Sequence, residues 1–487
     1  MIDTKALRSR ILDLAIQGKL TDQLPSDGTA EELYQQIQAE KQALINEGKI
    51  KKEKPLPEIS TDEIPFEIPS NWKIIRLADI SMVISKGTTP RGGKVSYLES
   101  GIGFLRAENL MGFDKIDTSN LKFIDEETHL GYLKRSVLES GDILISIAGT
   151  LGRTGIVHEE DLPLNTNQAI AFIRLCKKDL CCLEYIAFML NTAFVQKALG
   201  FKKVDMAIPN LSLNVISNIL LPLPPLAEQK RIVERVEKIF RLLDTIDEAQ
   251  EKYSADSQIL KAKLITAGIQ GKLTKQLPSD GTAEELYQQI QAEKQKLIKE
   301  GKLKKEKPLP PVSPEEVPFE ILENWMWVHL GEIFQHNTGK ALNSANNDGQ
   351  LLEYITTSNV YWDRFELDSL KQMYFSDTEI EKCTIRKGDL LMCEGGDIGR
   401  SAIWNFDFEM RIQNHLHRLR GYIPDICQKY YYYLMWLYKD KGMIDGRGIG
   451  LQGFSSKRVH ELVVPLPPLA EQKRIADVLE RALGEIE

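Results

Sequence analysis

Apolar residues recur every three or four positions along one long stretch near the middle of the chain. They are Ile232, Val236, Ile239, Leu243 and Ile246, followed after a polar interruption by Tyr253, Leu260, Leu264 and Ala267. Steps of four and three residues give a mean period near 3.5, which is typical of a long helix packed against a second helix. About 45 residues pass without proline or internal glycine before Gly268, which predicts a helix roughly 65 Å long. We interpret this helix as a spacer, because no small domain needs one of that length.

The two ends of the chain carry the two halves of the same pattern. Leu7, Ile11 and Leu14 stand 253 residues before Leu260, Leu264 and Ala267. At the other end, the start of the pattern is repeated by Ile475, Leu479, Ala482 and Ile486. The sequence therefore predicts a second spacer helix, antiparallel to the first and divided between the chain ends. The predicted order is cyclic, helix, domain, helix, domain, and forms a pseudo-two-fold repeat.

Near-identical blocks recur in the same order in both halves of the chain. Residues 16–42 and 269–295 differ at one position, and PLPPLAEQKRI occurs at 222–232 and again at 465–475. Between these blocks the halves have mostly diverged, although GDILISIAGTLGR at 141–153 is echoed later by GDLLMCEGGDIGR. Two explanations stay open. Either a recent duplication has drifted, or the connectors contact the same partner twice while the domains bind different targets.

Each half also contains about 150 residues in which short β patterns, turns and an amphipathic helix are mixed. The natural fold class is α+β. The full prediction is two α+β domains separated by two long antiparallel helices that form a coiled-coil-like spacer. The expected boundaries are 1–24 (first part of the split helix), 25–64 (first connector helix and linker), 65–222 (first domain), 223–275 (central helix), 276–317 (second connector helix and linker), 318–465 (second domain) and 466–487 (last part of the split helix).

Charge and cysteine content exclude several kinds of protein. The net charge is −8, and residues 66–220 hold 17 basic and 17 acidic side chains, so binding of nucleic acid would need local basic faces. The six cysteines form no Cys-x-x-Cys pair, which indicates free thiols in a reducing cytoplasm and no metal site. The sequence shows neither a secretory signal nor a run of about 18 apolar residues that would predict a membrane span.

The repeated blocks resemble those of the specificity subunits of type I restriction–modification enzymes. The resemblance rests on PFEIPSNW at 65–72 and PFEILENW at 318–325, on KGTTPR at 86–91, on PLPPLAEQKRI after each domain and on the split helix. It covers essentially the whole chain. It implies that each domain is a target-recognition domain that reads one half of a bipartite, asymmetric site in double-stranded DNA.

The resemblance also implies partners. The helices would dock two methyltransferase subunits and, through them, restriction subunits, while the chain itself would not be catalytic. S-adenosylmethionine, ATP and Mg²⁺ are expected in those partner subunits, and no cofactor is expected in this chain.

Side chains suited to reading DNA gather at the predicted turns of both domains. Arginine and lysine suit guanine edges and phosphates, asparagine and glutamine suit adenine, and hydroxyls or exposed glycine amides suit phosphates. An ordinary polar turn is the competing interpretation of each. His415 and His417 alternate along a predicted strand and are expected on one side of it. The candidates are Lys86, Gly87, Thr88, Thr89, Arg91, Arg106, Asn109, Arg153, Thr166, Asn167 and Gln168 in the first domain, and Thr338, Lys340, Thr357, Ser358, Asn359, Arg400, Gln413, Asn414 and His415 in the second.

Motifs of the relevant enzymes are missing from the chain. No Asn/Asp-Pro-Pro-aromatic loop suits adenine methylation, and GTLGRTG at 149–155 lacks the spacing and the lysine of a P-loop. Glu228 and Lys230 have the Glu-x-Lys spacing of some nucleases, but they predict a helix start with an acid near the positive end of the dipole. Two further functions stay open: the recognition arm of a modification-only system, and a protein-binding coiled-coil scaffold.

Overall fold

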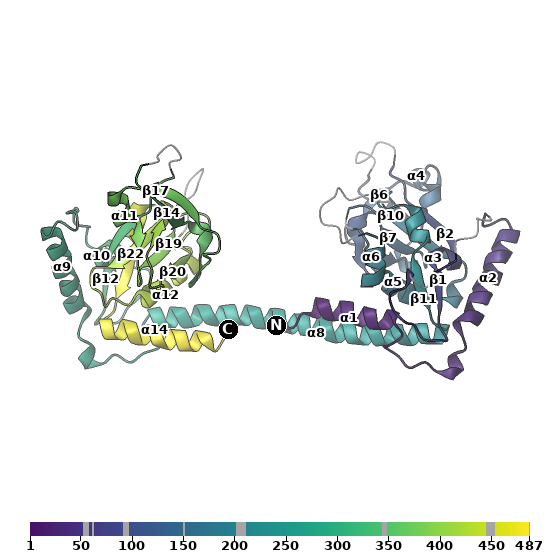
Figure 1. Cartoon of the computed structure of the whole chain (residues 1–487), viewed down its shortest axis with the longest axis horizontal. Helices are drawn as coiled ribbons and strands as arrows, with labels where there is room; N and C mark the ends of the chain where they lie inside the picture. Colours follow the sequence, from purple (N-terminus) through teal and green to yellow (C-terminus); the bar gives the residue numbers. More distant parts are fainter. Residues whose placement is uncertain are drawn as a thin grey trace. The chain divides into compact units, whose positions relative to one another are not determined.

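The computed structural model describes residues 1–51, 58–60, 63–90, 97–149, 151–200, 211–342, 348–444 and 453–486. The chain divides into two units, Met1–Glu251 and Lys252–Glu487. Helix α8 (Leu226–Ile269) is continuous and gives its first part to unit 1 and its last part to unit 2 (Figure 1). No helix in the described ranges is long and apolar enough to cross a membrane. The long central helix predicted from the apolar period is therefore present, and it ends one residue beyond Gly268.

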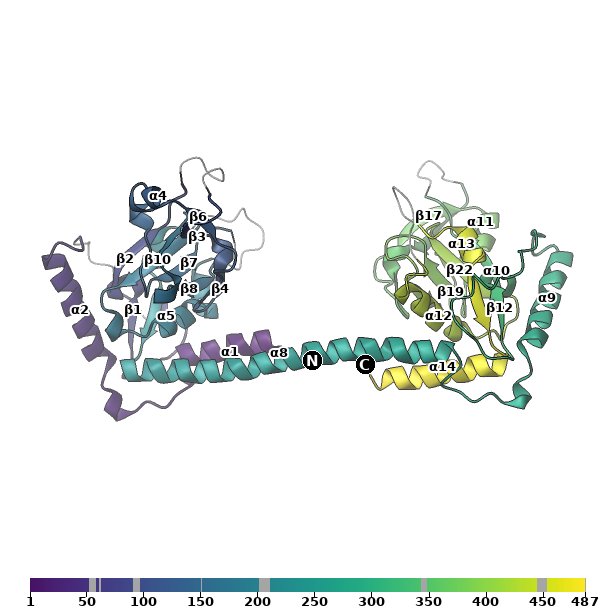
Figure 2. The ribbon, with the colours of Figure 1, turned by 180° about the vertical axis from the view of Figure 1, so that it is seen from behind.

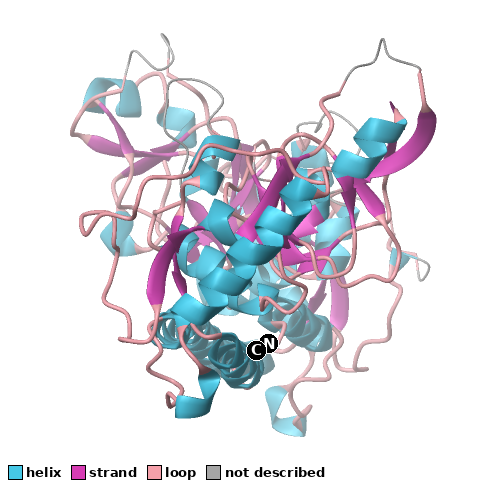
Figure 3. Ribbon diagram, turned by 90° about the vertical axis from the view of Figure 1, so that its left-hand side faces the viewer, coloured by secondary structure: helices cyan, strands magenta, loops and turns pink. Residues whose placement is uncertain are grey.

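Unit 1 mixes helices and strands around a four-stranded antiparallel sheet (Figure 1). Helices and strands are mixed throughout the view of Figure 3 as well. That sheet runs in the order β2 (Ser81–Lys86), β10 (Ile170–Leu175), β7 (Ile143–Ser146), β8 (Thr154–Ile156). A three-stranded sheet runs β6 (Lys122–Ile124), β3 (Ile102–Leu105), β9 (Leu164–Thr166), and β4 (Leu110–Gly112) with β5 (Lys115–Ile116) forms a hairpin. The helices are α1 (Thr4–Ile16), α2 (Ala30–Asn46), α3 (Leu77–Ile80), α4 (Glu126–Leu130), α5 (Leu183–Leu190), α6 (Ala193–Ala198) and α7 (Leu213–Ser217).

The first and last strands of the domain in unit 1 pair with each other. β1 (Lys73–Arg76) is antiparallel to β11 (Leu220–Leu223), with Lys73 opposite Leu223. The chain therefore enters and leaves the domain at neighbouring positions, and α8 begins directly after β11 (Figure 1). Figure 2 shows β1 and α8 from behind. Helix α2 lies on the flank beside α3, where the side chains of Gln38 and Lys41 donate to the carbonyls of Asp79 and Ala78 at 2.9 and 2.5 Å.

Unit 2 repeats this topology. Its four-stranded sheet runs in the order β13 (Phe334–Thr338), β22 (Leu416–Gly421), β19 (Leu390–Cys393), β20 (Ser401–Ile403), and β12 (Met326–His329) pairs with β23 (Val463–Leu466). A second sheet runs β17 (Lys371–Phe375), β14 (Gln350–Ile355), β21 (Met410–Ile412), β18 (Thr384–Ile385), and β15 (Val360–Tyr361) with β16 (Arg364–Phe365) forms the hairpin. The helices are α9 (Ala283–Lys299), α10 (Leu330–Ile333), α11 (Asp377–Cys383), α12 (Gln428–Asp440), α13 (Ser456–His460) and α14 (Leu469–Gly484). Both units are thus mixed helix–strand structures, as the α+β prediction requires.

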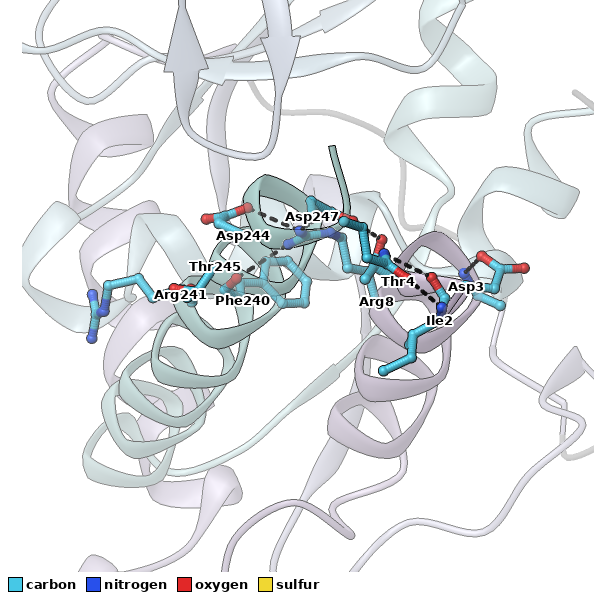
Figure 4. A network of polar contacts seen from close by, with 11 residues as sticks. Ile2, Asp3, Thr4, Arg8, Phe240, Arg241, Asp244, Thr245 and Asp247 are labelled. Carbon is cyan, nitrogen blue, oxygen red and sulfur yellow. Dashed lines mark hydrogen bonds and ion pairs between the residues drawn. The ribbon is translucent and has the colours of Figure 1, made fainter. Parts of the chain in front are cut away.

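Helix α1 lies against the first part of α8 and is held there by polar contacts (Figure 4). The guanidinium of Arg8 donates to Asp244 at 2.9 Å and to Asp247 at 2.8 Å, and the Thr4 hydroxyl donates to Asp247 at 2.5 Å. Arg8 also lies over the ring of Phe240, with its guanidinium carbon 5.3 Å from the centroid. These contacts use the polar side of α1, which the apolar period did not identify.

The apolar side of α1 differs from the prediction. Leu7 is 42% exposed, whereas the buried apolar residues are Leu12, Ala15 and Ile16. Ile11 is half-buried and packs at the edge of the same core. A heptad seam assumes one partner helix, but α1 also contacts α5 and α6 of the domain, and this rotates its buried face. The predicted seam is therefore wrong at Leu7.

The same shift occurs in the last part of α8, which packs against α14. Leu260 is 46% exposed, while Ile265 and Ile269 are fully buried and Leu264 is partly buried. Gly268 lies inside the helix, where a Cβ would be 2.8 Å from Leu479 Cδ1, so glycine allows α14 to approach closely. Tyr253 is 59% exposed, so the predicted seam is wrong there as well. The other positions are buried at Ile232, Val236, Leu243, Ile475 and Leu479, and half-buried at Ile239, Ile246, Ala267, Ala482 and Ile486.

Candidate nucleic-acid interface

Two candidate turns of unit 1, about 80 residues apart in sequence, lie side by side. The N–H of Gly87 donates to the carbonyl of Ile170 at 3.0 Å, and that of Thr88 to Thr166 at 3.1 Å. The Thr89 hydroxyl donates to the side chain of Gln168. A Cβ on Gly87 would be 2.2 Å from a carbonyl oxygen of the neighbouring turn, so this position requires glycine. The expected exposed amide of Gly87 is wrong, because the amide is used inside the domain.

The corresponding turns of unit 2 also meet, but Lys340 has an internal role. A Cβ on Gly339 would be 2.0 Å from the carbonyl oxygen of Ile412, and Lys340 is 8% exposed. The Lys340 ammonium donates to the carbonyl of Tyr374 at 2.6 Å and to Glu379 at 2.7 Å. This hydrogen bond lowers the pKa of Glu379. We call the candidates that remain available to contact DNA the contact set, and we leave Lys340 out of it.

The asparagines after β3 and β14 close turns in the same way. Buried Asn109 accepts from the N–H of Arg106 at 2.9 Å and donates to the carbonyl of Asp117 at 3.1 Å. Asn359 accepts from the N–H of Thr356 at 2.9 Å and donates to the carbonyl of Glu366 at 2.9 Å. Because their amide groups are used within the turn, we also leave Asn109 and Asn359 out of the contact set.

The two arginines that follow the glycine-rich turns differ in exposure. Arg153 is exposed. Arg400 is half-buried, donates to the carbonyl of Thr357 at 2.7 Å and lies over the ring of Tyr361 at 5.1 Å. Arg106 is half-buried and forms an ion pair with Glu108. Arg91 lies outside the described residues.

His415 and His417 do not share a side of the strand. His415 precedes β22 and is exposed, with its Nδ1 4.0 Å from a Glu394 carboxylate oxygen. His417 lies within β22, fully buried, hydrogen-bonded to His336 at 2.9 Å and to the carbonyl of Phe454 at 2.8 Å. Burial keeps the pKa of His336 and of His417 well below its ordinary value. In the described part of the chain, no cluster of three or more His, Cys, Asp or Glu residues could hold a metal ion.

The candidate turns connect the strands at one end of each four-stranded sheet, and we call this end the sheet edge. β2 ends at Lys86 where β10 begins, and β7 ends where β8 begins. The antiparallel pairing therefore brings residues 86–89, 147–149, 151–153 and 167–169 to that edge. The same pairing in unit 2 brings together the turns after β13, after β19 and before β22. The buried candidates are Gly87, Asn109, Thr166, Lys340 and Asn359. The exposed ones are Lys86, Arg153, Gln168, Ser358 and His415, and the half-buried ones are Thr88, Thr89, Arg106, Asn167, Thr338, Thr357, Arg400, Gln413 and Asn414.

The sequence matches a known family twice, once in each unit. The family model described as Type I restriction modification DNA specificity domain matches residues 69–252 and 322–487. The chain belongs to this family. It is 27% identical to the specificity subunit of type I restriction enzyme EcoAI from Escherichia coli, across 98% of this chain and 89% of that protein. It is 26% identical to the EcoEI specificity subunit, also from Escherichia coli, across 98% and 88%.

Solved structures of type I systems share the fold. The HsdS subunit from Thermoanaerobacter tengcongensis aligns with a TM-score of 0.51 at 17% identity, covering 87% of this chain and 91% of that one. A chain from a solved type I R-M system aligns with a TM-score of 0.59 at 18% identity, covering 87% and 92%. This specificity subunit therefore has two recognition domains, one in each unit.

The motif that follows each domain of the specificity subunit has an internal role that the sequence did not reveal. Glu228 is fully buried and accepts from the indole N–H of Trp72 at 2.9 Å; Glu471 accepts from Trp325 at the same distance. Arg231 forms a bidentate pair with Asp27 at 3.0 and 2.6 Å, which lowers the pKa of Asp27. The motif thus joins the start of the domain, its end and the connector. Only the recurrence of tryptophan and AEQKR at matching positions could have indicated this pairing.

Proposed function

We propose that the chain is the DNA-reading subunit of a type I restriction–modification enzyme, with each domain reading one half of a bipartite, asymmetric site. The observation that carries the proposal is the repeated sheet edge. The same fold gathers candidate turns at the same edge in both units, yet the exposed candidates there differ: Lys86, Arg153 and Gln168 in one, His415 in the other. Equal scaffolds with unlike polar edges suit two half-sites of unlike sequence.

Chemistry would belong to partner subunits. Two methyltransferase subunits would bind S-adenosylmethionine and methylate adenine, and restriction subunits that join through them would use ATP and Mg²⁺. Helix α8, with α1 on its first part and α14 on its last part, would be the spacer in a pseudo-two-fold arrangement. Because contacts with the DNA backbone give affinity and base contacts give specificity, this division needs no catalytic group in the chain.

The test is to express the chain with the methyltransferase encoded beside it and to map N6-methyladenine on genomic DNA. Replacing residues 66–220 by the domain of another specificity subunit should change one half of the modified motif. Modification without regard to base order would end the proposal, as would a change in both halves. A protein-binding scaffold would give no sequence-selective, salt-dependent duplex binding.

Single substitutions test the sheet edge. Arg153→Ala and Gln168→Ala should each lower modification of the first half-site, by roughly 5- to 150-fold if a base contact worth about 1–3 kcal/mol is lost. The matched control is Lys177→Ala, since Lys177 follows the opposite end of β10 and is also exposed. If Lys177→Ala had the same effect as Arg153→Ala, the proposed edge would be wrong.

A further inference from the structure

The hairpin of each recognition domain has an unusual backbone conformation at its tip. Phe113, between β4 and β5, has φ 57°, and Asp363, between β15 and β16, has φ 56°. In the described residues these are the non-glycine positions with positive φ. Each stands four residues after the turn-closing asparagine, Asn109 or Asn359, so the two tips correspond. Aspartate tolerates the left-handed region, whereas phenylalanine there is an outlier that calls for a compensating contact.

In unit 1 that contact is with the long helix. The ring of Phe113 lies 5.3 Å from that of Phe240 on α8, at an interplanar angle of 66°. It lies 5.6 Å from Phe188 on α5, at 79°. Both are edge-to-face arrangements, the favourable geometry for aromatic pairs. The tip of the first domain is therefore fixed to α8 by an apolar contact.

In unit 2 the corresponding tip contacts α14 through charges. The carboxylate of Asp363 is 2.8 Å from the ammonium of Lys429 on α12, and that ammonium is 3.4 Å from Glu480 on α14. The position that matches Phe240 is Leu483, so α14 offers no aromatic ring there. The aromatic contact of this hairpin is instead with α12, where the ring of Trp362 lies 6.0 Å from that of Tyr432. The second tip is therefore fixed to α14 through a lysine that bridges two carboxylates.

Each tip also touches the strand that follows the candidate arginine. The Thr154 hydroxyl, next to Arg153, donates to the carbonyl of Phe113 at 2.7 Å. In unit 2 the N–H of Asp363 donates to the carbonyl of Ser401, next to Arg400, at 3.3 Å. Each tip thus lies between a helix, α8 in unit 1 or α14 in unit 2, and the residue that follows the candidate arginine.

We propose that Phe113 and Asp363 are positioning residues that set the orientation of each recognition domain on its helix, one by an apolar contact and the other by a salt-sensitive ionic contact. The consequence for DNA rests on the proposed function, because a rotated domain would present its half-site at another distance. The contacts themselves can be tested without DNA. If a recognition domain were transferred from one unit to the other, it would keep its orientation only if the helix residues that contact its tip were transferred with it.

The first test is hydrogen exchange in the full-length chain at two salt concentrations. Between about 50 mM and about 500 mM NaCl, exchange of residues 360–365 should rise at least about threefold, while exchange of residues 110–116 stays nearly constant. Asp363→Asn should give the high-salt rate at low salt, and Phe113→Asn should raise exchange of its own hairpin equally at both concentrations. Asparagine is chosen because it tolerates positive φ.

Two further variants make this test specific. Lys429→Gln, which removes the bridging ammonium and leaves the residue at the tip unchanged, should give the high-salt rate of residues 360–365 at low salt. Lys387→Met removes an exposed ion pair, 2.6 Å from Asp407, and should change neither hairpin. An equal salt response in the two hairpins, or an unchanged rate in Asp363→Asn, would overturn the proposal.

The second test maps methylated sites made by complexes that contain these variants. Phe113→Asn and Asp363→Asn should add sites whose central spacing differs by about one base pair, with the bases of both half-sites unchanged. Lys429→Gln should have the same effect as Asp363→Asn. A loosened hairpin with unchanged spacing would refute the positioning role. If the unmodified complex showed no sequence preference, the proposed function would fail, and the exchange data alone would decide whether the tip contacts exist.

Discussion

The close approach of α8 and α14 at Gly268 predicts a specific pair of compensating substitutions. Gly268→Ala places a methyl group 2.8 Å from Leu479, and overpacking of this kind costs about 1–3 kcal/mol. Alanine in a helix interior returns about 1 kcal/mol relative to glycine, so the net loss should be about 0–2 kcal/mol. Leu479→Val alone should cost about 1 kcal/mol, because one buried methylene is removed.

The double variant should be nearly as stable as the original chain. Unit 1 already has this combination, with Ala15 and Val236 at the corresponding positions, both in the same core. The coupling between the two substitutions should therefore be about 1–3 kcal/mol. Native-state hydrogen exchange of the α14 amides in the full chain measures it. Gly484→Ala is the control, since a Cβ there meets nothing within 4 Å. Effects that add to within about 0.5 kcal/mol would refute the close contact.

Three further outcomes follow from buried polar groups. Trp72→Phe and Trp325→Phe should each destabilise their own unit by about 1.5–3 kcal/mol in urea unfolding, because a buried carboxylate loses a donor; no loss would mean that the glutamates find other donors. Burial holds the pKa of His336 and His417 below the ordinary 6.5, so the unfolded chain binds more protons in acid. The urea concentration at the unfolding midpoint of unit 2 should therefore decrease as the pH is lowered below 6.5. The decrease should be smaller in His417→Asn, and an equal decrease in that variant would contradict this. Lys340→Met should destabilise unit 2 and raise the pKa of Glu379 towards 4.5, yet leave the modified bases unchanged; altered bases would return Lys340 to the contact set.

The long helix could be predicted because an apolar period sustained over about 40 residues has few alternatives. Its buried face could not be predicted in full. Leu7 and Leu260 fit the heptad but are exposed, because the helices that carry them pack on a recognition domain as well as on each other. A periodic pattern in sequence counts positions around one axis and carries no information on a second packing partner.

Prediction of the candidate site from the sequence was limited by a different ambiguity. Asn109, Gly87 and Lys340 have chemistry suited to DNA, yet each is used inside its domain. The groups that close a turn are the same amides, hydroxyls and ammonium groups that bind bases and phosphates. Only the fold shows which of them remain exposed, as Arg153 and Gln168 do.

The pairing of β1 with β11 has a consequence for how such proteins can change their targets. Because the two strands are hydrogen-bonded neighbours, everything between them is a loop closed at its base, whatever its length or sequence. Trp72, just before β1, donates a hydrogen bond to Glu228, just after β11, and this contact closes the base. A recombination event that exchanges only the sequence between Trp72 and Glu228 leaves the helices and this hydrogen bond intact. A crossover that replaces one of these two residues leaves the other without its hydrogen-bond partner. If the chain reads DNA as proposed, new target specificities would arise by exchange of whole domains with fixed boundaries.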